Sequence, residues 1–198
     1  VSGQSVGIFA QSGQGNAVAI NVSGSISASS YDGYAVGLVA RADEGFSSIA
    51  NFGGGSITAY SAYGYAIGML GTGDGVGASN IGTIEASGYY LAAGIVAHST
   101  NYTSVSTSDG SISAIAVGAA YGIDAQSVYG NVRVNSSNSI EAVGIVLGAR
   151  GIQATSEYGY VALGNSGDIY AGSLYGDAIG IYAYSGDGSG TPGSGGGV

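Results

Sequence analysis

The stretch Gly151-Ile152-Gln153-Ala154 and its copy Gly180-Ile181-Tyr182-Ala183 decide the fold, because they repeat one four-residue motif 29 residues apart. The motif, Gly-apolar-x-Ala, recurs along the chain. Its copies begin at Gly7, Gly37, Gly94, Gly122, Gly151 and Gly180, and Gly68-Met69-Leu70-Gly71 is a degenerate copy. The starting glycines lie 30, 31, 26, 28, 29 and 29 residues apart. Such a fixed period indicates a repeat architecture.

A second motif, Gly-Ser-Ile-x-Ala, runs in phase with the first. It begins at Gly24, Gly55 and Gly110, and variants begin at Gly82, Asn138 and Gly167. A weaker apolar segment lies between the two motifs, as in Val132-Arg133-Val134. Each period therefore predicts three short strands separated by turns. The glycine density and the β-branched residues disfavour helix.

The spacing within each motif predicts which side chains form the core. In a strand, the Ile and the Ala two positions later share one face, so Ile8 and Ala10 point inward. The residue between them points outward and varies freely, from Phe9 to Asp124 to Tyr182. We therefore expect an all-β parallel β-helix, or β-solenoid, of about seven coils of about 29 residues with three short strands each. Crossover preference favours a right-handed winding.

One position near the second motif carries repeated asparagines, at Asn51, Asn80, Asn135 and Asn165. Stacked asparagine side chains can form hydrogen-bonded amide ladders. Asparagine also tolerates left-handed backbone geometry, so independent turn residues are the alternative. We expect a partial ladder along this corner.

Composition excludes several classes of function. The chain has 198 residues, 40 of them Gly, a net charge of −9, and only Arg41, Arg133 and Arg150 as basic residues. Nucleic-acid binding needs several cations to neutralise phosphates, so no nucleic-acid partner is expected. An anionic membrane surface is disfavoured for the same reason. The absence of Cys removes disulfides and Cys-metal sites, and no apolar run is long enough for a transmembrane helix.

The two ends of the chain differ from the repeats. Residues 1–184 are predicted to form a single β-solenoid domain, and residues 185–198 a Gly/Ser-rich tail or linker. Neither end resembles a cap, and the sequence starts at Val1 without a signal peptide. We expect a segment of a longer protein.

Runs of the type Gly-Ile-x-Ala-x-Ser followed by Asn-Ser-Gly-x-Ile-x-Ala, closest in Gly151 to Ser185, point to a family. They resemble the β-helical passenger regions of Gram-negative autotransporters and related large exported adhesins, over nearly the whole chain. The resemblance implies a right-handed parallel β-helix at the outer bacterial surface or outside the cell. The membrane-inserting barrel of that family is not within this sequence.

The resulting functional hypothesis is a non-catalytic structural shaft or stalk of an adhesin-like protein. One alternative is a self-assembling extracellular fibre or biofilm-matrix subunit, and another is a carbohydrate-binding or carbohydrate-active β-helix. The expected partners are other copies of the chain or flanking segments of the parent chain, and cell-surface glycans or a host surface.

The sequence predicts no catalytic, cofactor-binding or metal-ligating residue. Glu85 and Glu141 share an outward slot two coils apart, as a glycosidase pair would, but solvated wall charges are the simpler interpretation. His98, the only His, lacks a Ser-His-Asp spacing and is expected at an exposed wall or turn position. Gly73-Asp74-Gly75 and Gly186-Asp187-Gly188 resemble calcium-binding repeats without their nonapeptide period, so Ca²⁺ is at most an incidental ligand.

The hypothesis of a ligand-binding or self-association site rests on the sixteen tyrosines. Many precede the first motif and should stack along one edge of the solenoid, because the repeat is in phase. The candidate ligand or self-association edge comprises Tyr31, Tyr34, Tyr63, Tyr65, Tyr89, Tyr90, Tyr121 and Tyr175. Tyrosine offers a flat apolar ring and a polar tip, which suits sugars or a neighbouring shaft. The alternative is that the rings shield the edge of the core.

Overall fold

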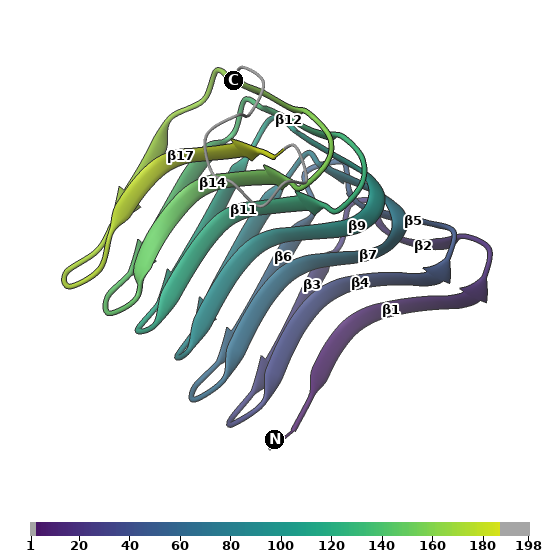
Figure 1. The fold of residues 1–198 in the computed structure, drawn as a ribbon. Helices are drawn as coiled ribbons and strands as arrows, with labels where there is room; N and C mark the ends of the chain where they lie inside the picture. Colours follow the sequence, from purple (N-terminus) through teal and green to yellow (C-terminus); the bar gives the residue numbers. More distant parts are fainter. Residues whose placement is uncertain (1–2, 187–198) are drawn as a thin grey trace.

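The structure is a computed structural model that describes residues 3–186. It is an all-β parallel β-solenoid of about six turns, with parallel bridges about 29 residues apart and no helix in the part described. The ribbon shows the turns stacked side by side, with the chain advancing by one turn per period (Figure 1). The predicted fold class is therefore confirmed.

The first wall holds the Gly-apolar-x-Ala motifs. Its strands, in stacking order, are β1 (Ser5–Gln14), β4 (Tyr34–Glu44), β7 (Tyr65–Asn80), β9 (Leu91–Thr107), β11 (Ala119–Ser127), β14 (Gly148–Ser156) and β17 (Ala178–Ser185). These strands are longer than the repeat predicts. The strands β7 and β9 continue around the corner and supply the second wall of their own turns.

The other two walls complete each turn. The second wall contains β2 (Ala17–Asn21), β5 (Phe46–Asn51), the later parts of β7 and β9, β12 (Val132–Ser136) and β15 (Val161–Asn165). The third wall is a separate sheet of β3 (Ser25–Ser30), β6 (Ser56–Ser61), β8 (Thr83–Gly88), β10 (Ser111–Ala116), β13 (Ser139–Gly144) and β16 (Ile169–Gly172). Within residues 3–186 the first wall has seven strands, and these strands begin or end about six full turns. The expected number of seven coils therefore equals the number of first-wall strands and not the number of turns.

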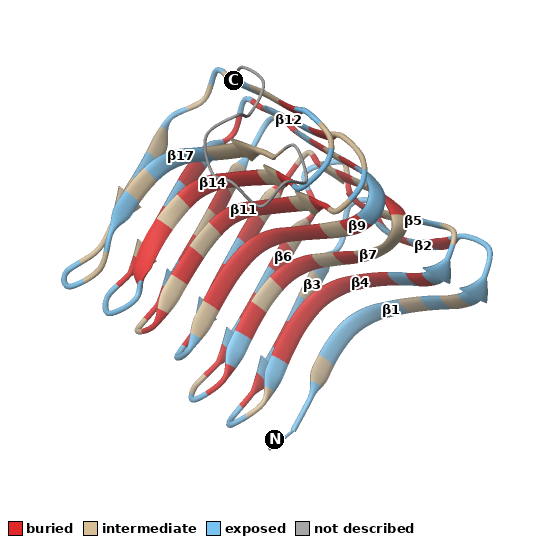
Figure 2. Cartoon of the chain, in the orientation of Figure 1, coloured by how far each residue is buried: buried red, intermediate tan, exposed pale blue. Residues whose placement is uncertain are grey.

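The strand register aligns the motifs that the sequence repeats. Ile95 pairs with Met69 on one side and with Ile123 on the other, and Ala97 pairs with Gly71 and Ala125. The inward Ile, Leu, Met and Val side chains of the three walls form one fully enclosed core. Figure 2 shows this burial in the middle turns, whereas β1 at one end of the stack is largely exposed. Ile95 is 0% exposed, but Ile8 and Ile181 in the end strands are 37% and 44% exposed.

A second core cluster contains only alanines, contributed by the first and third walls. Because alanine is small, the two walls approach closely there and meet in a thin edge, visible as narrow loops at the lower left of Figure 1. Ala35 belongs to this cluster, while Leu38, three residues later, belongs to the larger core. The strict inward-outward alternation therefore breaks at Gly37, and the strand bends.

The bend requires glycine. A Cβ atom at Gly94, the equivalent of Gly37, would lie 2.2 Å from the Ile112 Cγ2 atom of the third wall and 2.6 Å from the Gly122 carbonyl oxygen. The glycine that opens each copy of the first motif thus lets an isoleucine of the opposite wall pack against its backbone. Because the first-wall strands bend toward the core, their outer face is concave (Figure 1).

An asparagine ladder is present over three turns and contains two of the four expected residues, Asn51 and Asn80, together with Asn21. Asn21 donates from Nδ2 to Asn51 Oδ1 at 2.8 Å, and Asn51 donates in the same way to Asn80 at 2.8 Å. The next turns place Thr107 and Ser136 at this position, and their hydroxyls hydrogen-bond at 2.9 Å. The expectation for Asn135 is wrong. Its side chain is exposed on the outer face of β12, because the ladder position of that turn is one residue later.

The predicted boundary near residue 185 falls at the end of β17. Ser185 pairs with Ser156 and donates from its hydroxyl to the Gly159 carbonyl at 2.8 Å, so it belongs to the solenoid. The rest of the predicted tail, residues 187–198, lies outside the described residues. In the described part of the chain, no helix is long and apolar enough to cross a membrane.

We predict that Gly94→Ala lowers the free energy of unfolding by about 1–3 kcal/mol, because the added Cβ overpacks the contact with Ile112. Urea denaturation of both variants measures the effect. Gly13→Ala is the matched control: this glycine also lies in a first-wall strand, but an added Cβ would meet nothing within 4 Å. Equal stability of the two variants would contradict the proposed role of the bend glycine.

We also predict that Asn51→Ala lowers the free energy of unfolding by about 1–3 kcal/mol, since it leaves buried partners in the ladder without a hydrogen bond. Asn135→Ala, at the exposed position beside the ladder, should change it by less than about 0.5 kcal/mol. Thermal or urea unfolding distinguishes the two, and a larger effect at Asn135 would refute the assigned ladder.

Candidate functional site

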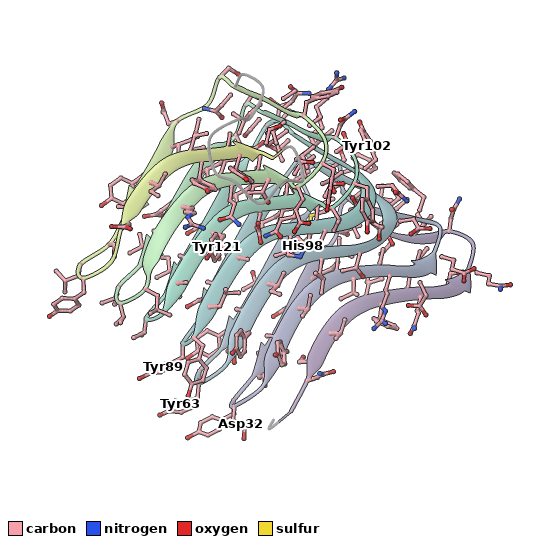
Figure 3. The ribbon with its side chains drawn as sticks, in the orientation of Figure 1. Asp32, Tyr63, Tyr89, His98, Tyr102 and Tyr121 are labelled. Atoms are coloured by element: carbon pink, nitrogen blue, oxygen red, sulfur yellow. The ribbon has the colours of Figure 1, made fainter. Side chains whose placement is uncertain are left out.

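The structure brings six of the eight predicted tyrosines together at the thin edge. We call Tyr31, Tyr34, Tyr63, Tyr65, Tyr89 and Tyr90 the tyrosine edge. They come from three successive turns between the third and first walls, and Figure 3 shows Tyr63 and Tyr89 projecting there beside Asp32. The in-phase repeat accounts for this placement.

The six rings form two files that run along the stack. In the inner file, Tyr34 stacks on Tyr65 with ring centroids 4.8 Å apart and planes 12° apart, and Tyr65 lies 5.8 Å from Tyr90. In the outer file, Tyr63 lies 5.1 Å from Tyr31 and 6.0 Å from Tyr89. An edge-to-face contact of 5.2 Å between Tyr89 and Tyr90 joins the files. The rings remain 37–58% exposed, so they pack on one another and still present apolar surface to solvent.

Tyr121 and Tyr175 do not join the tyrosine edge. Tyr121 immediately precedes its motif glycine and lies within β11 on the outer face of the first wall, opposite Ala93 and Arg150. Tyr175 does lie at the thin edge, but in the last turn and beyond the exposed aliphatic residues Ile145, Val146 and Leu147. Tyr121 differs from the edge tyrosines because it lies directly before Gly122 inside β11, whereas Tyr34 and Tyr65 lie three residues before their motif glycines.

The concave outer face of the first wall is a surface that the sequence did not predict. We call it the first-wall groove; it is formed by the outward residues on either side of the bend. Its early part has an apolar floor, and a hollow of about 330 Å³ is lined there by Phe9, Val36, Val39, Ile67 and Leu70 among others. Although Val39 and Val96 point away from the core, they are only 6% and 7% exposed, as expected on a concave face.

Polar side chains replace the apolar floor of the groove in β11 and β14. The Asp124 carboxylate accepts hydrogen bonds from Gln126 Nε2 at 2.9 Å and from Gln153 Nε2 at 3.0 Å. His98 Nε2 lies 2.9 Å from Asp124 Oδ2. Arg150 donates to Gln153 Oε1. We call these five side chains the Asp124 network.

Two tyrosines flank this network. The Arg150 guanidinium carbon lies 4.9 Å from the Tyr182 ring centroid and 5.9 Å from that of Tyr121, within the range of cation–π contacts. The Asp124 side chain is 12% exposed and that of His98 40%. Figure 3 shows His98 and Tyr121 together on the outer face of the first wall, away from the tyrosine edge. The network therefore combines fixed polar groups with partly open aromatic rings.

The structure places His98 on the first wall and pairs it with Asp124 of the next turn, 26 residues away. The sequence predicts an exposed wall or turn position for His98 and indicates no partner for it. The one available signal was the outward slot of the first motif, where Asp124 and Gln153 replace Val39 and Val96.

The remaining polar candidates stay dispersed. Glu85 and Glu141 are exposed on the third wall with Ser113 between them in register, and Ser113 donates to Glu141 Oε2 at 3.3 Å. Across residues 3–186, no three His, Asp or Glu side chains gather as they would around a metal ion. Of the two calcium-like segments, that at Asp187 lies outside the described residues.

These features define the chain as a parallel β-solenoid with two distinct outer surfaces, the tyrosine edge and the first-wall groove. Comparisons with protein-family models, with curated proteins and with solved structures find no match.

We predict that the stacked pair Tyr34 and Tyr65 is energetically coupled by about 0.5–1.5 kcal/mol beyond the burial of its apolar area. A double-mutant cycle with Tyr34→Ala and Tyr65→Ala, measured by urea unfolding, gives the coupling. The pair Tyr34 and Tyr170, on different walls, is the control and should be additive within about 0.5 kcal/mol. Additivity in both cycles would show that the tyrosine edge is not a packed unit.

Proposed function

We propose that this chain is a structural shaft or stalk segment of an adhesin-like protein on the outer surface of a bacterium or secreted from it, without a catalytic role of its own. The supporting observation is the in-register stack of about six similar turns around one continuous core. In such a stack each turn contacts mainly its neighbours, so length is added turn by turn without changing the cross-section. About six turns at about 4.8 Å give a rod segment of about 29 Å.

Composition supports a position outside the cell. The sequence has no Cys, so the fold needs neither a disulfide nor a reduced thiol. Its motifs resemble the passenger regions of exported bacterial adhesins, which combine the same fold with transport across the outer membrane. The partners of such a shaft are flanking segments of its parent chain and, through its outer surfaces, cell-surface glycans or a host surface.

A second candidate, a self-assembling fibre or biofilm-matrix subunit, is favoured by the two ends of the described stack. Phe9 and Ile8 in β1 and Ile181 in β17 are exposed apolar side chains beside strand edges without a neighbour among residues 3–186. Open parallel edges of this kind pair readily with another strand. In a shaft, adjoining turns of the same chain cover these edges; in a fibre, another copy does.

Electron microscopy and sedimentation of the purified chain over a concentration series separate the two candidates. The shaft proposal predicts particles of constant length at every concentration, with or without Ca²⁺. Filaments of one solenoid width that lengthen with concentration would refute the shaft proposal and support the fibre. Ile8→Asp is the control, because Ile8 is an inward core residue left exposed at the open end strand β1, and a charge at this end face should abolish filaments that form by stacking without lengthening or shortening a shaft segment.

A further inference from the structure

The Asp124 network is not needed for the fold. In the strand register Asp124 stands directly between Val96 of β9 and Gln153 of β14, and Tyr121 stands between Ala93 and Arg150. The turn formed by β9 has the same bend and the same inward residues, with Val and Ala at these two outward positions. Burial of a carboxylate costs free energy that burial of a valine does not. The polar residues therefore call for an explanation other than the fold.

The network holds its polar groups in fixed positions. Asp124 accepts from Gln126 and Gln153 and contacts His98, so its carboxylate cannot rotate without breaking these bonds. Arg150 is fixed in turn by Gln153 and by the rings of Tyr121 and Tyr182. A set of donors and acceptors that is ordered before binding loses less entropy when a ligand arrives.

The groups that remain on the outer side of the network both donate and accept. The Gln126 side-chain oxygen is an acceptor, the guanidinium of Arg150 has further N–H donors, and the hydroxyls of Tyr121 and Tyr182 do both. The tyrosine rings add flat apolar surface. A ligand that matches must carry both donor and acceptor hydroxyls and apolar C–H faces.

The charges near the network select a neutral ligand. Asp124 and Arg150 both bond to the Gln153 side chain, so their opposite charges offset one another, and the net charge of −9 disfavours an anionic ligand. Neutral sugars have the required combination of hydroxyl groups and apolar ring faces. On the first wall Asp124 pairs with Val96, and Val96 pairs with Leu70, which lines the hollow of about 330 Å³. This series of outward positions has room for a chain of several sugar units rather than one.

We propose that the first-wall groove binds a neutral oligosaccharide over the Asp124 network, with sugar rings against Tyr121 and Tyr182 and hydroxyls bonded to Gln126 and Arg150. This site is separate from the tyrosine edge and does not depend on the shaft proposal. It makes the wall of the solenoid itself a ligand-binding surface.

Isothermal titration calorimetry of the full chain tests the proposal, with neutral hexasaccharides of glucose, mannose and galactose as probes and a hexamer of galacturonic acid as the acidic counterpart. The informative variants are Tyr121→Ala and Asp124→Val, because Ala93 and Val96 show that the same backbone accepts these residues. We expect at least one neutral probe to bind, and each variant to weaken its binding by about tenfold or more.

Tyr170→Ser is the matched control, since Tyr170 is an exposed outward tyrosine on the third wall. Tyr63→Ser tests the tyrosine edge. Both should leave binding unchanged. Failure of every neutral probe to bind with a Kd below about 1 mM would overturn the proposal. So would binding of the acidic probe alone, or full affinity in both Tyr121→Ala and Asp124→Val.

A measurement on the unmodified protein guards against variants that fail to fold. Titration of the bound neutral probe into isotope-labelled protein should shift the backbone amide resonances of β11 and β14 and leave those of β8 and β10 on the third wall in place. Shifts confined to the third wall or to the tyrosine edge would place the ligand elsewhere and refute the assigned site.

Discussion

The structure depends on parallel pairing in register, which places each residue directly above its counterpart one period earlier. Equivalent inward residues of successive turns therefore form a column, and each of them must fit its neighbours in the turns above and below as well as its own turn. Ile95 packs between Met69 and Ile123, so a residue of another size would disturb three turns at once. The same constraint acts on polar residues. A buried asparagine is stable in the column from Asn21 to Asn80 because its amide bonds to the copies above and below as well as to a glycine carbonyl.

The glycine of the first motif determines the shape of the cross-section. Because Gly94 has no side chain, Ile112 of the opposite wall reaches its backbone and the strand bends toward the core. The bend has two consequences. On the inner side it separates the large aliphatic core from the alanine cluster and so produces the thin edge. On the outer side it produces the concave groove. Both outer surfaces thus arise from one packing contact that the stack repeats.

This dependence explains how far sequence reasoning could go. The inward residues repeat, so the fold class, the period and the core columns follow from the spacing of Gly94-Ile95-Val96-Ala97 and its copies. The tyrosine edge follows in part, since Tyr34 and Tyr65 hold the same place in successive periods. The ladder position of the turn that contains Asn135 is one residue later, and a shift of one residue cannot be recognised in a spacing that varies between turns. To predict the contact of His98 with Asp124 one must know of the bend, and a strand pattern alone does not contain it.

Inward and outward positions are therefore under different constraints. A substitution at an inward position changes a column and is restricted by its neighbours, whereas an outward position changes the chemistry of one turn and leaves the backbone in place. The groove illustrates the difference, because its floor passes from Val96 to Asp124 within one turn while Ile95 and Ile123 beside them remain nearly identical in environment. A solenoid of this kind can thus keep one scaffold over many turns and vary its binding surface turn by turn. In this chain, a binding site is best sought at an outward residue that differs in chemistry from the residues paired with it in the neighbouring turns.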